Sequence, residues 1–396
     1  MSHILISHSL DLKKLRDEGY DLEVWPGSGY LLVKEVPYVN NRREVRRGIL
    51  VSPLTLAGDI TTKPDTHVAY FIGDHPCRPN GDEIEQIKNN SSERQLAEGL
   101  VVNHMFSAKP PDPYPDYYAK MKTYASIIES QAQLIEPATS AKTFPIIEPD
   151  KEDKDAVFNY IDTASSRAEI DLISNKLANH KIAIIGLGGT GAYVLDLVAK
   201  TRVKEIHLFD KDAFLQHNAF RSPGAPSVEE LRVKTTKAAY LQNIYSKMRI
   251  GIIVHEEYVG PENVDQLQGM QFVFLCIDRS TEKKLIVERL EEFGIPLVDV
   301  GMGIYETDNM LGGILRVTTS TPEQRDHFRS RVAFSDSHEH NEYKQNIQIA
   351  DLNALNAALA VIKWKKCFGF YLDLDHEHHC TYTIDGNTLT NEDRRS

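Results

Sequence analysis

The sequence has little cysteine and no long apolar run. Its 396 residues include four cysteines, and no two of them form a C-x-x-C pair. A disulfide framework and a four-thiolate zinc site are therefore excluded, and a reducing compartment is the simplest setting. No run of about 18 apolar residues occurs, and no basic segment followed by an apolar stretch opens the chain. We therefore expect a cytoplasmic protein that does not contact a membrane.

Positive charge is also in short supply. Lysine and arginine number 45 against 57 aspartates and glutamates, which gives a formal net charge of −12. We expect no nucleic-acid partner, because binding through bulk electrostatics needs clustered cations. Hydrophobic residues make up 41% of the chain, which is enough for packed cores. At about 100–200 residues per domain, the length predicts two domains.

The N-terminal part of the chain predicts a small α+β domain over residues 1–145. Short strand-like runs such as residues 29–36 are separated by Pro, Gly and Asn clusters. A helix is expected at 117–134, after a proline-rich stretch. Residues 146–160 are charge-dense and lack apolar periodicity, so we expect a linker there, followed by a second domain at 161–396.

Apolar strands alternate with helical stretches in the second domain. The expected strands are residues 181–185, 206–210, 252–254, 272–278, 297–300 and 313–317. The expected helices are residues 189–200, 234–248, 282–293 and 349–366. This alternation is typical of right-handed βαβ units. We therefore predict an α/β fold with a doubly wound, Rossmann-like and mostly parallel sheet.

A glycine-rich loop lies between the first strand and the first helix of this domain. Its sequence is Gly186-Leu-Gly188-Gly189-Thr-Gly191. Glycine lets the backbone turn sharply and approach a phosphate, and the helix N-terminus offers free N–H groups to the anion. Asp210 comes 24 positions after Gly186, where an acid would hold a ribose hydroxyl. We expect a nucleotide site, and the alternative is a glycine turn needed only for helix–strand packing.

Residues downstream of Asp210 indicate which nucleotide chemistry to expect. Asn218, Arg221 and Lys234 follow it at +8, +11 and +24. Fixed cations stabilise the charge that an α-phosphate gains when a carboxylate attacks it and pyrophosphate leaves. Asp278 ends an apolar strand at the ligand-binding edge of an open sheet, where a carboxylate can hold Mg²⁺. The alternative is an NAD-binding oxidoreductase or a non-catalytic Rossmann module that binds a partner, neither of which needs these groups.

Taken together, these motifs resemble the adenylating domain of the ThiF/MoeB/HesA family, which includes the ubiquitin-activating enzymes. The similarity covers about residues 160–390 and is specific because several motifs occur in fixed order. It implies that the four glycines cradle ATP phosphates, that Asp210 binds ribose and that Asp278 coordinates Mg²⁺. It also implies that the triphosphate is lined by Asp212, Asn218, Arg221 and Lys234. Lys283 departs from the pattern, because many relatives have an arginine there.

The resemblance implies attack of a C-terminal carboxylate on ATP to give an acyl-adenylate and pyrophosphate. The implied partner is a ubiquitin-like or sulfur-carrier protein that ends in glycine. The N-terminal domain would bind or position that partner or a conjugating enzyme, as in bacterial ubiquitin-like conjugation operons. Another possibility is activation of a small carboxylate on a peptide, a sulfur carrier or an RNA base, although the low basic charge disfavours RNA.

Family members also use an arginine from the partner protomer, located before the glycine loop. Arg167 is the candidate for that role, which would make the enzyme a homodimer. The alternative is an ordinary solvated helix charge.

Many of these activating enzymes pass the adenylate to a cysteine in the crossover segment, but residues 318–347 contain none. The protein therefore either stops at adenylation or uses a thiol elsewhere. Cys77, in a Pro/Gly-rich loop, and Cys380, after clustered histidines that can lower a thiol pKa, are the candidate thiols. A structural role is the alternative for each. We expect residues 375–380 to form a solvated loop rather than a metal site, and residues 335–342 to form a solvated loop or a flap.

Overall fold

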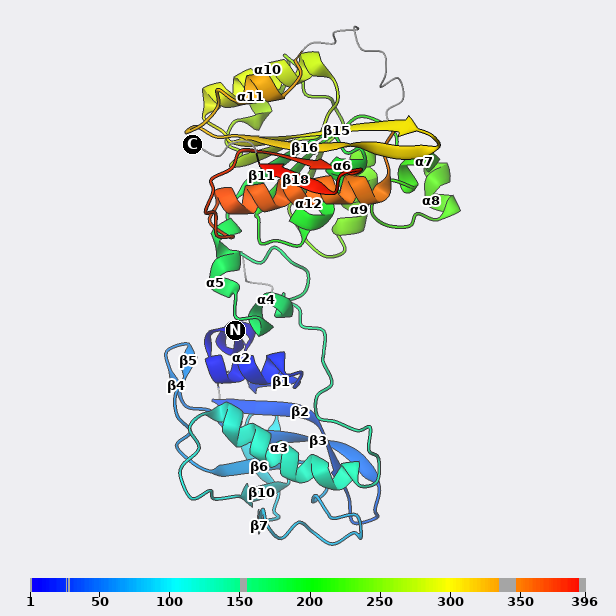
Figure 1. Ribbon diagram of the computed structural model, residues 1–396. Coiled ribbons are helices and arrows are strands. Elements are labelled where there is room, and N and C mark those ends of the chain that lie inside the picture. The colour runs from blue at the N-terminus through cyan, green and yellow to red at the C-terminus, as the bar shows by residue number, and fades with distance from the viewer. Residues whose placement is uncertain (1, 26, 28, 150–154, 335–346, 392–396) are drawn as a thin grey trace. The chain divides into compact units, whose positions relative to one another are not determined.

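The structure, a computed structural model (Figure 1), describes residues 2–25, 27, 29–149, 155–334 and 347–391. The chain divides into two compact units, one of residues 1–154 and 160–168 and the other of residues 155–159 and 169–396. The segment between their main bodies therefore contributes to both units. In the described part of the chain, no helix combines the length and the apolar character needed to cross a membrane. The predicted flap at 335–342 lies outside the described residues.

The first unit is a six-stranded antiparallel sheet with helices packed on it, which confirms the predicted α+β class. The sheet order is β1 (Leu22–Trp25), β2 (Tyr30–Val39), β3 (Val45–Pro53), β6 (Val68–Ile72), β10 (His104–Ser107), β7 (Lys88–Asn90). Two small hairpins are β4 (Leu56–Ala57) with β5 (Ile60–Thr61), and β8 (Arg94–Ala97) with β9 (Leu100–Val102). The helices are α1 (Ser2–His8), α2 (Leu10–Asp17), α3 (Tyr117–Gln133) and α4 (Thr163–Arg167).

Helix α3 forms where the sequence predicts a helix, and it builds much of the core of this unit. The side chain of Asp116 caps its N-terminus by accepting the backbone N–H of Ala119 at 2.7 Å. Apolar side chains at a spacing of three and four lie on its buried face, including Met121, Tyr124 and Ile128. This face packs on β2 and β3, and its removal from water stabilises the unit.

One lysine lies on the buried face of α3. Lys120 is fully buried, and its ammonium donates to the hydroxyl of Ser52 at 2.9 Å and to the carbonyl of Thr66 at 2.8 Å. Both acceptors are neutral. Burial lowers the pKa of Lys120 to about 8, because a charged ammonium is poorly solvated there.

We expect the contribution of Lys120 to the free energy of unfolding of the first unit to rise with pH between about 8 and about 10. In this window the unfolded chain keeps the proton on Lys120, whose ordinary pKa is 10.5, while the folded unit releases it. The unfolded state therefore binds more protons, and the gain is about 2–3 kcal/mol. Cys77 and Tyr20 act in the opposite direction as the pH rises above about 9, because burial raises the pKa of both groups and the unfolded chain loses their protons first. Urea unfolding followed by Trp25 fluorescence measures it, and Lys120→Met should abolish the rise; an unchanged rise would contradict the assignment.

The second unit is an eight-stranded sheet with helices on both faces. The strand order is β13 (Ile252–His255), β12 (Glu205–Phe209), β11 (Lys181–Ile185), β14 (Phe272–Leu275), β15 (Leu297–Thr307), β16 (Met310–Ser320), β17 (His379–Thr383), β18 (Thr388–Asn391). The longer helices are α6 (Gly189–Ala199), α9 (Lys237–Tyr245), α10 (Ser280–Phe293) and α12 (Ala350–Cys367). The shorter ones are α5 (Asp171–Ser174), η1 (Asn175–Leu177), α7 (Gln216–Ala219), α8 (Val228–Val233), η2 (Val264–Leu267) and α11 (Phe328–Arg331).

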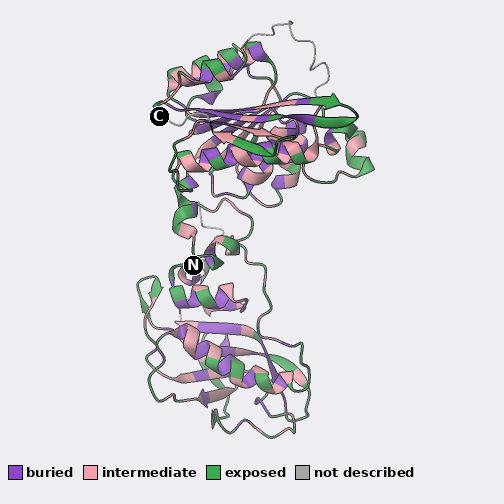
Figure 2. Cartoon of the chain, in the orientation of Figure 1, coloured by how far each residue is buried: buried purple, intermediate pink, exposed green. Residues whose placement is uncertain are grey.

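The predicted doubly wound, Rossmann-like fold is confirmed for this unit. From β13 to β15 all neighbouring strands are parallel. Helices α6, α9 and α12 pack on one face of the sheet and α10 and α11 on the other (Figure 1). Figure 2 shows the buried residues running along the strands between these two helical layers.

Three local expectations are wrong. The strand at 313–317 does not continue a βαβ series: β15 and β16 form a long antiparallel hairpin. Its turn residues, Asp308 and Asn309, have φ of 51° and 58°, as a two-residue hairpin turn requires. The strand expected at 272–278 ends at Leu275. The histidine-rich run is not all solvated loop, because His379 and Cys380 are buried in β17 and pair with β16.

Candidate active site

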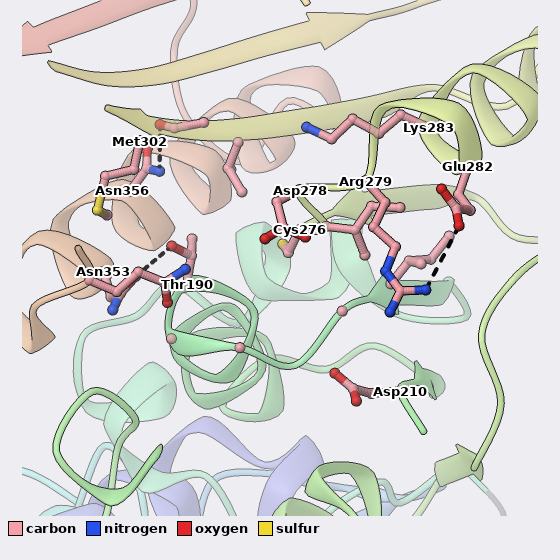
Figure 3. Close-up of a pocket in the computed structure, with 18 of the residues that line it drawn as sticks. Thr190, Asp210, Cys276, Asp278, Arg279, Glu282, Lys283, Met302, Asn353 and Asn356 are labelled. Atoms are coloured by element: carbon pink, nitrogen blue, oxygen red, sulfur yellow. Dashed lines mark hydrogen bonds and ion pairs between the residues drawn. The ribbon is translucent and has the colours of Figure 1, made fainter. Parts of the chain in front are cut away.

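A pocket of about 810 Å³ opens in the second unit at the carboxyl ends of its central parallel strands (Figure 3). The glycine loop after β11 and the residues that follow β12 and β14 line it. On one side of β11 the chain winds through β12 to β13, and on the other through β14 to β15. The pocket thus lies at the topological switch point of the sheet, where open α/β sheets bind ligands.

The glycine loop leaves room for a ligand in front of its backbone. Gly186 has φ of +87°, and a Cβ there would lie 2.7 Å from the carbonyl oxygen of Cys276, so only glycine fits. A Cβ on Gly188 would meet no atom within 4 Å, although this residue lines the pocket. Gly189 lines the pocket too, whereas Gly191 lies in α6 outside the lining. The space at Gly188 is where a phosphate can approach the backbone.

Helix α12, which comes late in the sequence of the domain, contacts the glycine loop. This contact was not predicted from the sequence. Asn353 is fully buried; its Oδ1 accepts the hydroxyl of Thr190 at 2.9 Å, and its Nδ2 donates to the carbonyl of Arg221 at 3.4 Å. Figure 3 shows Asn353 and Thr190 facing each other. Because Thr190 and Asn353 are 163 positions apart, no local signal in the sequence links them.

Asp210 lies at the end of β12, where the ribose acid was predicted. It is 5% exposed, and its carboxylate accepts the backbone N–H groups of Leu187 at 2.7 Å and Asp212 at 2.8 Å. Burial raises the pKa of Asp210, and these hydrogen bonds oppose the shift. Asp210 therefore fastens the glycine loop and also presents a carboxylate to the pocket.

Asp212 is paired with a lysine in the pocket wall. Its Oδ2 lies 2.7 Å from the ammonium of Lys237, and its Oδ1 accepts the hydroxyl of Tyr258. Partial burial acts to raise the pKa of Asp212, but the hydrogen bonds from Lys237 and Tyr258 outweigh it and lower the pKa. Asp212 is therefore held as an anion beside Lys237.

Of the two lysines near the start of α9, Lys237 lines the pocket and Lys234, the predicted one, does not. Lys234 is exposed at the end of α8, in a left-handed conformation, and does not line the pocket. Lys237 is 8% exposed at the start of α9 and does line it. The helix expected from residue 234 begins at Lys237 instead. The local signal for this start is Thr236, whose side chain caps the N-terminus of α9.

Of the two predicted residues near α7, Arg221 lines the pocket and Asn218 does not. Arg221 lines the pocket, and its Nε is buried without a hydrogen-bond partner among the described residues. A buried donor of this kind is costly unless a ligand satisfies it. Asn218 is buried outside the lining, where its side chain accepts the backbone N–H of Leu215 at 2.8 Å and shapes the turn.

The segment between β14 and α10 carries Asp278 into the pocket, as predicted. Lys283, from α10, reaches the fully buried Asp299 on β15 at 2.6 Å. Arg316 on β16 contacts the other oxygen of Asp299 at 2.7 Å. Lys283 and Arg316 line the pocket, but the positive charge of each is paired with the buried carboxylate of Asp299. Burial raises the pKa of Cys276, the pocket's cysteine.

The remaining predicted residues are not among those that line the pocket. Arg167 is exposed in the first unit, at the end of α4. Cys77 is fully buried in the first unit, its thiol donates to the carbonyl of His75 at 3.2 Å, and burial raises its pKa. Cys380 is buried in β17. The expectation that the Cys77 thiol is activated conflicts with this environment, because a reactive thiolate needs a lowered pKa.

The fold defines a Rossmann-like domain preceded by a separate antiparallel unit. The chain belongs to the ThiF family, whose model matches residues 167–364. A domain of unknown function (DUF6791) matches residues 10–163.

Two curated relatives are tRNA threonylcarbamoyladenosine dehydratases. The one from Haemophilus influenzae is 25% identical over 136 residues, 34% of this chain and 51% of that protein. The one from Escherichia coli is 27% identical over 127 residues, 31% of this chain and 47% of that protein. The chain thus spans about half the length of the curated relatives it matches. A similar solved structure, E. coli MccB with MccA-N7isoASN, is 18% identical over 59% of this chain and 70% of that chain, with a TM-score of 0.47.

Proposed function

We propose that the protein binds ATP in this pocket and adenylates the C-terminal carboxylate of a ubiquitin-like or sulfur-carrier protein. One observation carries the proposal: Arg221 and Lys237 line the same pocket as the open backbone at Gly188. A dinucleotide oxidoreductase has no need of two cations beside the glycine loop. Membership in the ThiF family supports the same reading.

In the proposed reaction, negative charge develops near Arg221 and Lys237. A carboxylate oxygen attacks the α-phosphorus, the bond to the β-phosphate breaks, and pyrophosphate leaves with the electron pair. Negative charge develops on the α-phosphate and on the leaving group. Arg221 and Lys237 would stabilise that charge, and Asp210 would hold the ribose. Consumption of ATP supports a cytoplasmic site of action.

Asp278 would hold Mg²⁺ in this scheme. Among the described residues, no group of three or more His, Cys, Asp or Glu side chains could hold a metal ion by itself. In nucleotide sites Mg²⁺ is bound through one or two carboxylates together with substrate phosphates, so a pocket that offers Asp278 fits this ion. When bound, Mg²⁺ would neutralise charge on the leaving pyrophosphate.

We end the proposed reaction at the acyl-adenylate, because the environments of the thiols do not support a thioester step. Burial raises the pKa of Cys77 and Cys276, and Cys380 is buried in β17. Cys367 is exposed, but it lies at the end of α12 outside the pocket lining. Two further proposals rest on the family resemblance alone. One is a homodimer in which Arg167 acts in the partner's site, and the other is that the first unit binds the protein partner or a conjugating enzyme.

An RNA nucleoside that bears a carboxylate is the second candidate substrate, because both curated relatives are named for tRNA threonylcarbamoyladenosine. The net charge of −12 disfavours it.

ATP–pyrophosphate exchange by the full chain tests the proposal. We expect exchange with a β-grasp protein that ends in Gly-Gly and none with the same protein amidated at its C-terminus. Asp278→Asn should reduce exchange at least about 100-fold. The matched control Asp265→Asn changes an exposed carboxylate paired with Arg289, and it should leave exchange unchanged. Exchange that depends on tRNA instead, or exchange unaffected by Asp278→Asn, would contradict the proposal.

A further inference from the structure

Arg279 lines the pocket beside Asp278, and no sequence motif pointed to it. Its guanidinium lies over the ring of Tyr258, with Cζ 4.6 Å from the ring centroid. The hydroxyl of Tyr258 in turn donates to Asp212. We call Asp212, Tyr258 and Arg279 the brace. Figure 3 shows the guanidinium on the side of the pocket where Asp210 and the glycine loop lie.

The pocket cations differ in how tightly carboxylates neutralise them. Lys237, Lys283 and Arg316 each lie within 2.7 Å of an aspartate oxygen. The ion pair of Arg279 with Glu282 is 3.8 Å long, and the two side chains are 54% and 38% exposed. Pairs that are this exposed contribute little, so most of the charge on Arg279 is available to a ligand.

The ring contact keeps that charge at the pocket wall. A cation over an aromatic face is attracted by the ring even at an exposed site, and the guanidinium keeps its in-plane N–H donors. The hydroxyl of Tyr258 is fixed on Asp212, which Lys237 also holds. The orientation of Arg279 is thus coupled to the Asp212–Lys237 ion pair through Tyr258.

We infer that Arg279 contacts the phosphates of the bound nucleotide in its own chain and that the rest of the brace positions it. This inference rests on the proposed function. Planar guanidinium donors match phosphate oxygens in pairs, which an ammonium cannot do. The family resemblance proposes that Arg167 of a second copy supplies an arginine to the pocket. With Arg279, each chain would supply an arginine contact to the phosphates from its own residues.

Calorimetric titration of the full chain with MgATP and with adenosine tests the inference. Arg279→Ala should weaken MgATP binding about 10- to 100-fold and leave adenosine binding unchanged, because only the phosphates lose a contact. Tyr258→Leu should have a smaller effect in the same direction, and Tyr258→Phe, which keeps the ring, the smallest. Arg289→Ala is the matched control: Arg289 lies on α10, which begins directly after Arg279, and has Cζ 4.6 Å from the Phe293 ring centroid, but it does not line the pocket.

The outcomes separate the two proposals. If the wild-type chain binds no MgATP, the proposed function fails and the inference fails with it. If the wild type binds MgATP and Arg279→Ala binds it equally well, or if adenosine weakens in parallel, the inference alone is overturned. Mixing Arg279→Ala with Lys237→Ala chains should restore no exchange, since each pocket lacks one of its own cations. Recovery of exchange would show that Arg279 acts across chains and would overturn the assignment within one chain.

Discussion

Replacing Lys237 with alanine should reduce ATP–pyrophosphate exchange at least about 100-fold, whereas replacing Lys234 should change it less than about twofold. The two lysines are three residues apart, but only Lys237 is buried in the pocket wall, beside Asp210 and Asp212. Lys234 is exposed and lies outside the lining. Without Lys237, two aspartates would face the incoming phosphates with no cation between them.

Steady-state exchange with saturating partner measures this difference, and thermal unfolding shows whether each variant keeps its fold. Lys237→Arg should recover part of the exchange, because it restores the charge in a different geometry. Loss of exchange in Lys234→Ala with retention in Lys237→Ala would reverse the assignment and favour the original spacing argument.

Replacing Asp299 with asparagine should lower the free energy of unfolding of the second unit by about 3–5 kcal/mol. Asp299 is fully buried and lies between the cations of Lys283 and Arg316, whose side chains are 8% and 22% exposed. An amide of nearly the same shape leaves both charges without their anion, and desolvated charges are costly.

Urea unfolding followed by the fluorescence of Trp364, which is buried in this unit, measures the change. Asp265→Asn breaks an ion pair of 2.7 Å that is exposed, and it should cost no more than about 1 kcal/mol. Adding Lys283→Met to Asp299→Asn should reduce the loss, because one uncompensated charge is removed. If Asp299→Asn and Asp265→Asn lower the free energy of unfolding equally, the ion pairs of Asp299 with Lys283 and Arg316 are not important for stability.

The parallel core of the second unit was predictable because its signals are local. Each strand is a short apolar run, each following helix has its own periodicity, and the glycine loop marks where they meet. The β15–β16 hairpin was not predicted because its strands were read as separate parallel ones. Its turn at Asp308 and Asn309 is the local signal that identifies the pairing.

The candidate site was predictable where it follows the chain through the glycine loop and the ends of β12 and β14. Asp210, Arg221 and Asp278 line the pocket as expected. The spacing rule named Lys234 rather than Lys237, because it did not allow for the short helix α8, at whose end Lys234 lies. Tyr258 and Asn353 come from a loop after β13 and from α12, and only the folded chain brings them to the pocket.

Because Asn353 contacts the glycine loop, the pocket cannot be fully assembled before α12 is synthesised. The loop and α6 are synthesised before α12, but the side chain that binds Thr190 belongs to α12. A nascent or truncated chain that ends before residue 350 therefore contains every strand from β11 to β16 and still lacks one of the contacts that hold the loop. The pocket is thus completed only after α12 has been made.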